Sequence, residues 1–165
     1  GDRLAASLTI GYAGDLQSVS GTVQIRAATD DSVHQTLEWS LEGVDASCTP
    51  GAGDRMAYSC GIHVHTGTSC AVTHDVGGHL YGGDADPWAY VVYVASGSDS
   101  SGSATVETGL QIWEMEGRAF VVHGSDGERI ACGILSGSGL DDLSAHPHYA
   151  GSVRSVPTTH SQRRY

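Results

Sequence analysis

The sequence predicts an all-β protein, an eight-stranded Greek-key β-sandwich or barrel of the immunoglobulin-like kind. Short segments rich in Val, Thr, Ile, Tyr and Trp are separated by Gly, Ser and Asp, which is typical of strands joined by turns. Glycine is abundant, with 23 residues, and proline is scarce, with four. The spacing of the strand-like segments matches a Greek-key sandwich. A chain of 165 residues is long enough to bury one sizeable core.

The clearest strands are expected in the first part of the chain, at residues 7–13, 19–28 and 33–41. In the third of these, Leu37, Trp39 and Leu41 fall on one face, because side chains alternate along a strand. We assign these three side chains to the core. Core packing alone accounts for Trp39, so this residue does not indicate a ligand site.

Shorter strands are expected further along the chain, including residues 90–95, 110–115, 118–123 and 129–135. The hydrophobic pattern then fades, and Ser, Gly, His and Thr dominate. Residues 1–137 are therefore the expected domain, and residues 138–165 are expected to be a flexible tail or an inter-domain linker. The chain begins at Gly1 with no visible signal peptide, so we expect a mature or excised piece.

The charge is strongly acidic over most of the chain. All eight basic residues are arginine, and three of them lie in the last dozen residues. Up to residue 150, five arginines face 19 carboxylates, a net charge of −14. Such a body repels nucleic acid and anionic membranes, and no apolar run is long enough for a membrane span. We interpret the acidity as a contribution to solubility.

Four cysteines without a Cys-x-x-Cys motif predict two disulfides and an extracellular or secretory-pathway location. Four cysteines allow three connectivities, and spacing alone does not choose among them. Cys48 and Cys60 bracket a Pro/Gly turn, which favours a local loop. That pairing would leave Cys70 with Cys132.

Two histidines, His63 and His65, are one residue apart in a strand-like segment. Both side chains then point the same way, with their Cα atoms roughly 6–7 Å apart, so two imidazoles can converge on one ion. A lone histidine on a strand is more often an ordinary polar residue. The pair, with His79 and His123 downstream, favours a metal site, and an all-nitrogen set favours copper or zinc.

Four motifs occur in order along the chain: Gly61-Ile62-His63-Val64-His65, Gly77-Gly78-His79, Gly117-Arg118-Ala119-Phe120-Val121-Val122-His123 and Arg129-Ile130-Ala131-Cys132-Gly133. Together they resemble the copper/zinc superoxide dismutases, over roughly residues 19–136. The resemblance implies a Greek-key β-sandwich and an enzyme that converts superoxide to O₂ and hydrogen peroxide by cycling between Cu(II) and Cu(I).

The resemblance also implies roles for single residues. His63 and His65 match the paired copper ligands, and His123 matches the ligand that ends a later strand. His79 matches the histidine that bridges copper and zinc in the family. Arg129 matches the arginine that guides and holds the superoxide anion, so Arg129 and His79 are the expected catalytic residues.

Cys70 and Cys132 match the intrasubunit disulfide of the family, in agreement with the pairing that the Cys48–Cys60 loop would leave. The alternative role for Arg129 is a surface ion pair with Glu128 or Asp126.

The sequence departs from the family at the zinc site. Two histidines and an aspartate that hold zinc in the family have no counterpart, because no histidine lies between His79 and His123. The loop before Arg129 is cut to five residues, 124–128. Both losses resemble the copper-only branch, which includes proteins built from several such domains. We therefore expect one copper and no zinc, with neighbouring repeats of the same chain as potential partners.

Without zinc, the second ring nitrogen of His79 needs another partner, since metal-bound histidines usually donate their other N–H. Asp84 and Asp86 are the nearest carboxylates in sequence, although both would also suit a turn before Pro87.

Two classes of function remain open. One is an extracellular copper-only superoxide dismutase, and the other is a non-enzymatic copper-binding or structural module of a repeat protein. Retention of Arg129 favours the enzyme.

Overall fold

The computed structural model describes residues 3–10, 19–30, 32–54 and 56–137. Within these residues the chain forms eight strands: β1 Arg3–Ile10, β2 Ser20–Ala27, β3 His34–Glu42, β4 Ile62–Val64, β5 Asp99–Glu107, β6 Ala119–His123, β7 Arg129–Ile134 and β8 Ser136–Gly137. Four short 3-10 helices join them: η1 Ala52–Asp54, η2 Thr73–Val76, η3 Pro87–Tyr90 and η4 Ile112–Met115. The predicted eight-stranded all-β fold is confirmed. The predicted tail at residues 138–165 lies outside the described residues.

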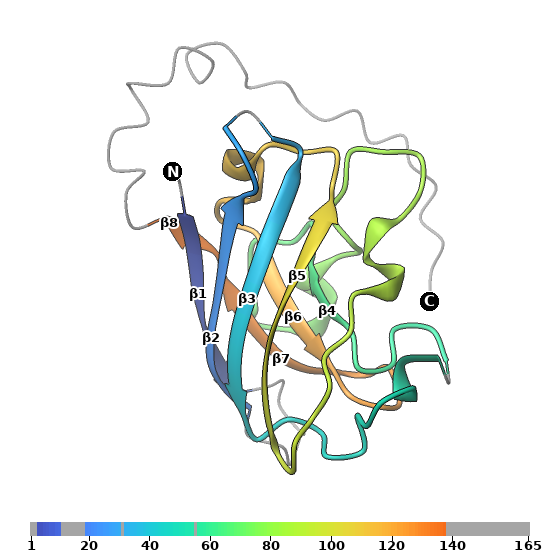
Figure 1. The fold of residues 1–165 in the computed structure, drawn as a ribbon. Helices are drawn as coiled ribbons and strands as arrows, with labels where there is room; N and C mark the ends of the chain where they lie inside the picture. Colours follow the sequence, from blue (N-terminus) through green and yellow to red (C-terminus); the bar gives the residue numbers. More distant parts are fainter. Residues whose placement is uncertain (1–2, 11–18, 31, 55, 138–165) are drawn as a thin grey trace.

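The strands form two antiparallel layers that share β1. Their hydrogen-bonded order is β4-β6-β7-β1-β2-β3-β5, and β8 also pairs with β1. β1 pairs with β2 from Arg3 to Leu8, whereas its last residues, Thr9 and Ile10, pair with β7. In Figure 1, β6 and β7 lie behind β3 and β5, as expected for a Greek-key sandwich.

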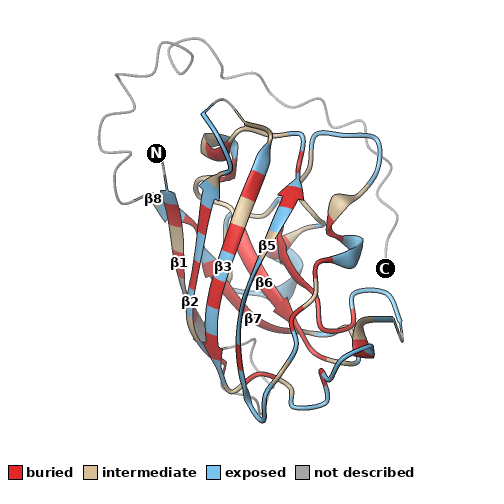
Figure 2. Cartoon of the chain, in the orientation of Figure 1, coloured by how far each residue is buried: buried red, intermediate tan, exposed pale blue. Residues whose placement is uncertain are grey.

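The core lies between the two layers. On β3 the residues alternate, with Leu37, Trp39 and Leu41 buried and Glu38 exposed between the first two, so the predicted core face is confirmed. Figure 2 shows this alternation as bands along β3. On β4 and β6 every residue is buried, because the face that turns away from the core is covered by loops.

Two segments predicted as strands are not strands. Residues 110–115 contain η4, which begins with a capping box in which the Gln111 N–H donates to Glu114 Oε2 at 2.8 Å. In the segment 90–95, Tyr90 is the last residue of η3, and the residues after it form no strand. This short helix begins at Pro87, with the side chain of Asp86 as its cap. The apolar pattern of residues 90–95 still indicates a core contact, because Tyr93 is buried in the core.

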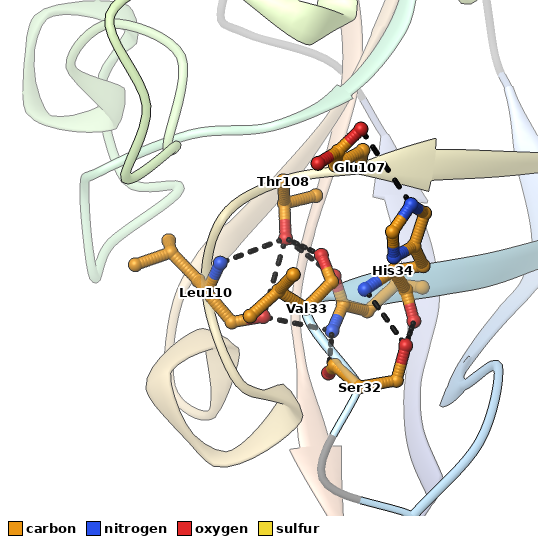
Figure 3. Close-up of polar contacts among 7 residues, drawn as sticks. Ser32, Val33, His34, Glu107, Thr108 and Leu110 are labelled. Atoms are coloured by element: carbon orange, nitrogen blue, oxygen red, sulfur yellow. Dashed lines mark hydrogen bonds and ion pairs between the residues drawn. The ribbon is translucent and has the colours of Figure 1, made fainter.

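A buried polar network ties together the loops at one end of β3 and β5 (Figure 3). The amide of Gln35 is fully buried and donates to the carbonyl oxygens of Ser32 and Leu110, at 3.2 and 2.9 Å. The Thr108 hydroxyl donates to Gln35 Oε1. This network satisfies a buried amide and fixes the turns, so its role is structural.

Two disulfides connect the loops to the sandwich, Cys48–Cys60 and Cys70–Cys132, as expected from the sequence and the resemblance. The first closes the loop that leads into β4. The second joins the loop after β4 to β7, and its separation of 62 residues makes it the larger entropic constraint. None of the helices in the described part of the chain is long or apolar enough to cross a membrane.

Candidate metal centre

Four histidines converge beside the layer that contains β4, β6 and β7: His63 on β4, His65 just after it, His79 in the following loop and His123 at the end of β6. We call these four residues the histidine cluster. Their ligand atoms all lie within 4.8 Å of one another. Strands β4 and β6 pair directly, and His65 forms an isolated bridge with His79. Backbone pairing therefore brings together residues that lie up to 60 positions apart in the sequence.

The strand period of two places His63 and His65 on one side of β4. Their ring centroids are 6.2 Å apart, and Ile62 and Val64 are fully buried in the hydrophobic core. Gly61 permits this arrangement, because a Cβ atom there would lie 2.2 Å from Cε1 of His63. Any side chain at position 61 would displace the His63 ring.

Backbone carbonyls fix the tautomers of two cluster histidines. Nδ1 of His65 lies 2.9 Å from the Gly77 oxygen, and Nδ1 of His123 lies 2.8 Å from the Gly127 oxygen. A carbonyl oxygen only accepts hydrogen bonds, so Nδ1 carries the proton in each neutral ring. Nε2 is then left with a free lone pair in both histidines.

His79 has a carboxylate partner instead. Its Nδ1 lies 2.7 Å from Oδ2 of Asp86, while Oδ1 of Asp86 accepts from the Trp88 N–H at 2.9 Å. Burial pushes the pKa of Asp86 up, but the hydrogen bond and charge of His79 outweigh it, and this pKa lies below its ordinary value. Of the two aspartates considered from the sequence, the structure brings Asp86 to His79 and leaves Asp84 exposed.

Three buried nitrogens of the cluster have no hydrogen-bond partner among the described residues: Nδ1 of His63, Nε2 of His65 and Nε2 of His123. Leaving a buried polar atom unsatisfied costs about 1–3 kcal/mol, so three in one place require an explanation. A bound metal ion would satisfy all three at once. Nitrogen-only donors at this spacing fit copper or zinc.

The same burial keeps these rings neutral. Burial, together with smaller contributions from the positive charges of His79 and Arg129, lowers the pKa of His65 to about 2 and that of His123 to about 4. Burial, and then the neighbouring histidines, hold the pKa of His63 well below its usual range. The lone pairs therefore stay available to a metal at neutral pH.

Arg129, the first residue of β7, lies beside the cluster. Its Nη1 donates to the Thr73 oxygen at 2.5 Å, and its Nη2 donates to the Gly77 oxygen at 2.8 Å. The Gly77 oxygen also binds His65, so one carbonyl links the arginine to the cluster. The guanidinium thus bonds to the loop after β4, whereas the alternative from the sequence was an ion pair with Asp126 or Glu128.

Two aromatic rings also contact the cluster, and sequence reasoning assigned a role to neither. The Tyr58 ring centroid lies 4.9 Å from that of His79, 6.0 Å from His123 and 6.3 Å from His63. The ring centroid of Trp88 lies 6.2 Å from that of His63. Tyr58 is in an irregular turn with no periodic pattern, so only its nearness to Cys60 and the His63 strand could have indicated it.

No protein-family model matches the chain, and no curated protein matches it in sequence. Solved structures do match it. The crystal structure of the clock protein EA4 has a TM-score of 0.55 at 16% identity, over 81% of this chain and 93% of that protein.

Two structures of superoxide dismutase 5 from Candida albicans are also similar. A mutant form has a TM-score of 0.54 at 14% identity, over 82% of this chain and 92% of that one. The Cu(II) form has a TM-score of 0.51 at 16% identity, over 82% and 91%. At these identities the likeness concerns the fold. The chain therefore resembles the superoxide dismutases in its fold, as it does in the order of its motifs.

Proposed function

We propose that the chain is an extracellular, copper-only superoxide dismutase. The observation that carries the proposal is the set of three buried nitrogens on His63, His65 and His123, which have no partner in the described part of the chain and lie close together beside His79. The fold shared with superoxide dismutase 5 of Candida albicans supports it. The two disulfides support an oxidising, extracellular compartment.

One copper would be held by Nδ1 of His63 and by Nε2 of His65, His79 and His123. Among the described residues, the nitrogens of His63, His65 and His123 have no hydrogen-bond partner. In His65, His79 and His123 the other ring nitrogen, Nδ1, is already hydrogen-bonded. Bound copper supplies a one-electron couple between Cu(II) and Cu(I). The net reaction consumes two superoxide anions and two protons and yields O₂ and hydrogen peroxide.

Arg129 supplies positive charge beside the cluster. Its guanidinium never loses its charge, and the two carbonyl bonds hold it in a fixed orientation. The rest of the body carries an excess of carboxylates and repels anions, so local attraction at Arg129 decides whether superoxide reaches the site. Arg129 thus guides and binds the substrate, and His79 completes the ligand set.

Zinc is not part of the proposal. In the copper/zinc enzymes that the motifs resemble, the second nitrogen of the bridging histidine binds zinc. In this chain, Nδ1 of His79 is bonded to Asp86. A carboxylate in this position orients the ring and increases the basicity of the ligand nitrogen, as outer partners of metal-bound histidines commonly do.

The second candidate function is a copper-binding module without turnover. The burial of the histidine rings favours it, because His63, His65 and His123 are each at most 3% exposed. Structural metal sites are closed, whereas catalytic sites keep one position open.

Superoxide consumption by copper-loaded protein, measured together with its copper and zinc content, tests the proposal. We expect one copper per chain, no zinc and rapid consumption. Arg129→Ala should consume superoxide more slowly at equal copper content, and Arg129→Glu more slowly still, because repulsion replaces attraction. Arg26→Ala, which removes an exposed arginine of β2, is the control and should match the unaltered protein. Stoichiometric copper without consumption would favour the module, and absence of copper would refute both.

A further inference from the structure

Tyr58 lies between the histidine cluster and solvent. Its ring contacts three of the four cluster rings, yet the residue is 38% exposed. The histidines beneath it are buried. A side chain that touches the cluster on one side and solvent on the other forms the outer wall of the site.

The second aromatic ring at the cluster has the opposite environment. Trp88 is fully buried, and its indole N–H donates to the Leu80 oxygen at 2.8 Å. It also packs within the hydrophobic core. Trp88 therefore lines the buried inner side of the cluster. Tyr58 lines the side that faces solvent.

The backbone directs the Tyr58 ring at a conformational cost. Tyr58 has a φ of 67° and Cys60 a φ of 56°, in the left-handed region that side chains rarely adopt. Hydrogen bonds hold the turn: Gly61 N donates to the Tyr58 oxygen at 3.0 Å, and Cys60 N donates to the Gly124 oxygen at 2.8 Å. The disulfide to Cys48 fixes the same turn. Non-glycine residues in this conformation concentrate at functional sites.

The turn also lies against the shortened loop before Arg129. The Ser59 hydroxyl donates to the Ser125 oxygen at 2.9 Å, and a Cβ on Gly127 would lie 2.8 Å from the Ala57 oxygen. Gly127 is the residue whose carbonyl binds His123. The disulfide-closed loop and the short loop thus lie against each other beside the cluster.

We propose that the Tyr58 ring is a selective cover of the metal site, which admits small anions and excludes larger ligands. The inference rests on the proposed function, because copper and superoxide give the cluster its ligand and its substrate. It adds a specificity-determining residue that the family motifs do not contain. The ring itself, rather than the hydroxyl, makes the contacts with the histidines.

Histidine modification in the metal-free protein tests the cover directly. Diethyl pyrocarbonate carbethoxylates accessible neutral imidazoles, and peptide mass spectrometry locates the sites. Tyr58→Asn removes the ring with a residue that tolerates left-handed backbone. We expect His79 and His123 to react several-fold faster in this variant, normalised to the exposed His74, whose side chain is 99% exposed. Tyr58→Phe keeps the ring and should react like the unaltered protein.

Chelator competition with copper-loaded protein tests the size selectivity. We expect Tyr58→Asn to lose copper several-fold faster to a bulky chelator such as bathocuproine disulfonate with a reductant, while azide perturbs the copper spectrum equally in both proteins. Tyr90→Asn, at an exposed tyrosine away from these ring contacts, should behave like the unaltered protein. Tyr58→Gly, which also suits the backbone, replaces the asparagine variant if that one fails to fold.

Equal carbethoxylation and equal copper loss in Tyr58→Asn and the unaltered protein would overturn the cover. Failure of the unaltered protein to bind copper would instead refute the proposed function, and the carbethoxylation experiment would still decide the accessibility of the cluster.

Discussion

Strands β3 and β4 are buried in different ways. On β3, Leu37 and Leu41 face the core, and the alternate residues face water. On β4, Ile62 and Val64 are buried in the core, and His63 on the opposite side is just as inaccessible. The difference lies in the loops, since those that carry His79 and Tyr58 cover the outer side of β4.

Strands β3 and β4 separate stability from function within one fold. The inner faces of both strands contribute apolar burial, which is the main favourable term in folding. The outer face of β4 contributes nitrogen atoms that remain unsatisfied without a metal, so it costs stability in the metal-free state. Substitutions on the two kinds of face should therefore affect different measurements.

The largest expected effects come from substitutions on the two faces. His63→Ala should abolish stoichiometric copper binding, because one of four ligands is lost. Leu37→Ala should lower the free energy of unfolding by about 2–5 kcal/mol and leave copper stoichiometry at one. Metal analysis and urea unfolding measure the two effects. Full copper occupancy in His63→Ala would contradict the ligand assignment, and His34→Ala, at an exposed histidine, is its control.

The pH dependence of the metal-free protein should come from the cluster. The pKa values of His65 and His123 are lower in the folded state, at about 2 and about 4, than the ordinary value of 6.5. The unfolded chain therefore binds more protons below pH 6.5, so stability falls as the pH drops from 6.5 toward 4. The slope is at most about 1.4 kcal/mol per pH unit for each histidine.

Urea unfolding of the metal-free protein at pH 7, 6 and 5 measures this slope. A variant with His65→Gln and His123→Gln should show a clearly flatter dependence. If both proteins lost stability equally over this range, the slope would have to arise from groups other than His65 and His123.

The smallest expected effect concerns the carboxylate behind His79. Asp86→Asn should weaken copper binding by about 10–100-fold, as loss of an outer partner of a metal-bound histidine typically does. Competition with a chelator of known copper affinity measures it. Asp84→Asn is the matched control, because Asp84 is exposed in the same loop. Equal affinities of the two variants would show that Asp86 serves only to cap η3.

Much of the fold and of the candidate site follows from local pattern. The period of two placed Leu37, Trp39 and Leu41 on one face, and His63 and His65 on another, because the pleat fixes side-chain direction residue by residue. The ordered motifs indicated His79 and His123. Local pattern failed at residues 110–115, where a cap begins the 3-10 helix η4 in place of a strand. It also failed at residues 90–95, which form an isolated bridge between Val92 and Gly61 but no strand.

The sequence by itself determined which residues are available: four candidate ligands among nine histidines, Arg129 three residues before Cys132, and four cysteines. Only the tertiary structure decided which nitrogen of each ring faces the common point. That choice depends on the carbonyls of Gly77 and Gly127 and on the Asp86 carboxylate, which approach from separate loops. The position of Tyr58 over the cluster has the same origin, because a left-handed turn and a disulfide direct its ring. Hydrogen bonds between segments that are distant in sequence leave no periodic pattern in the sequence. They can therefore be identified only in the three-dimensional structure.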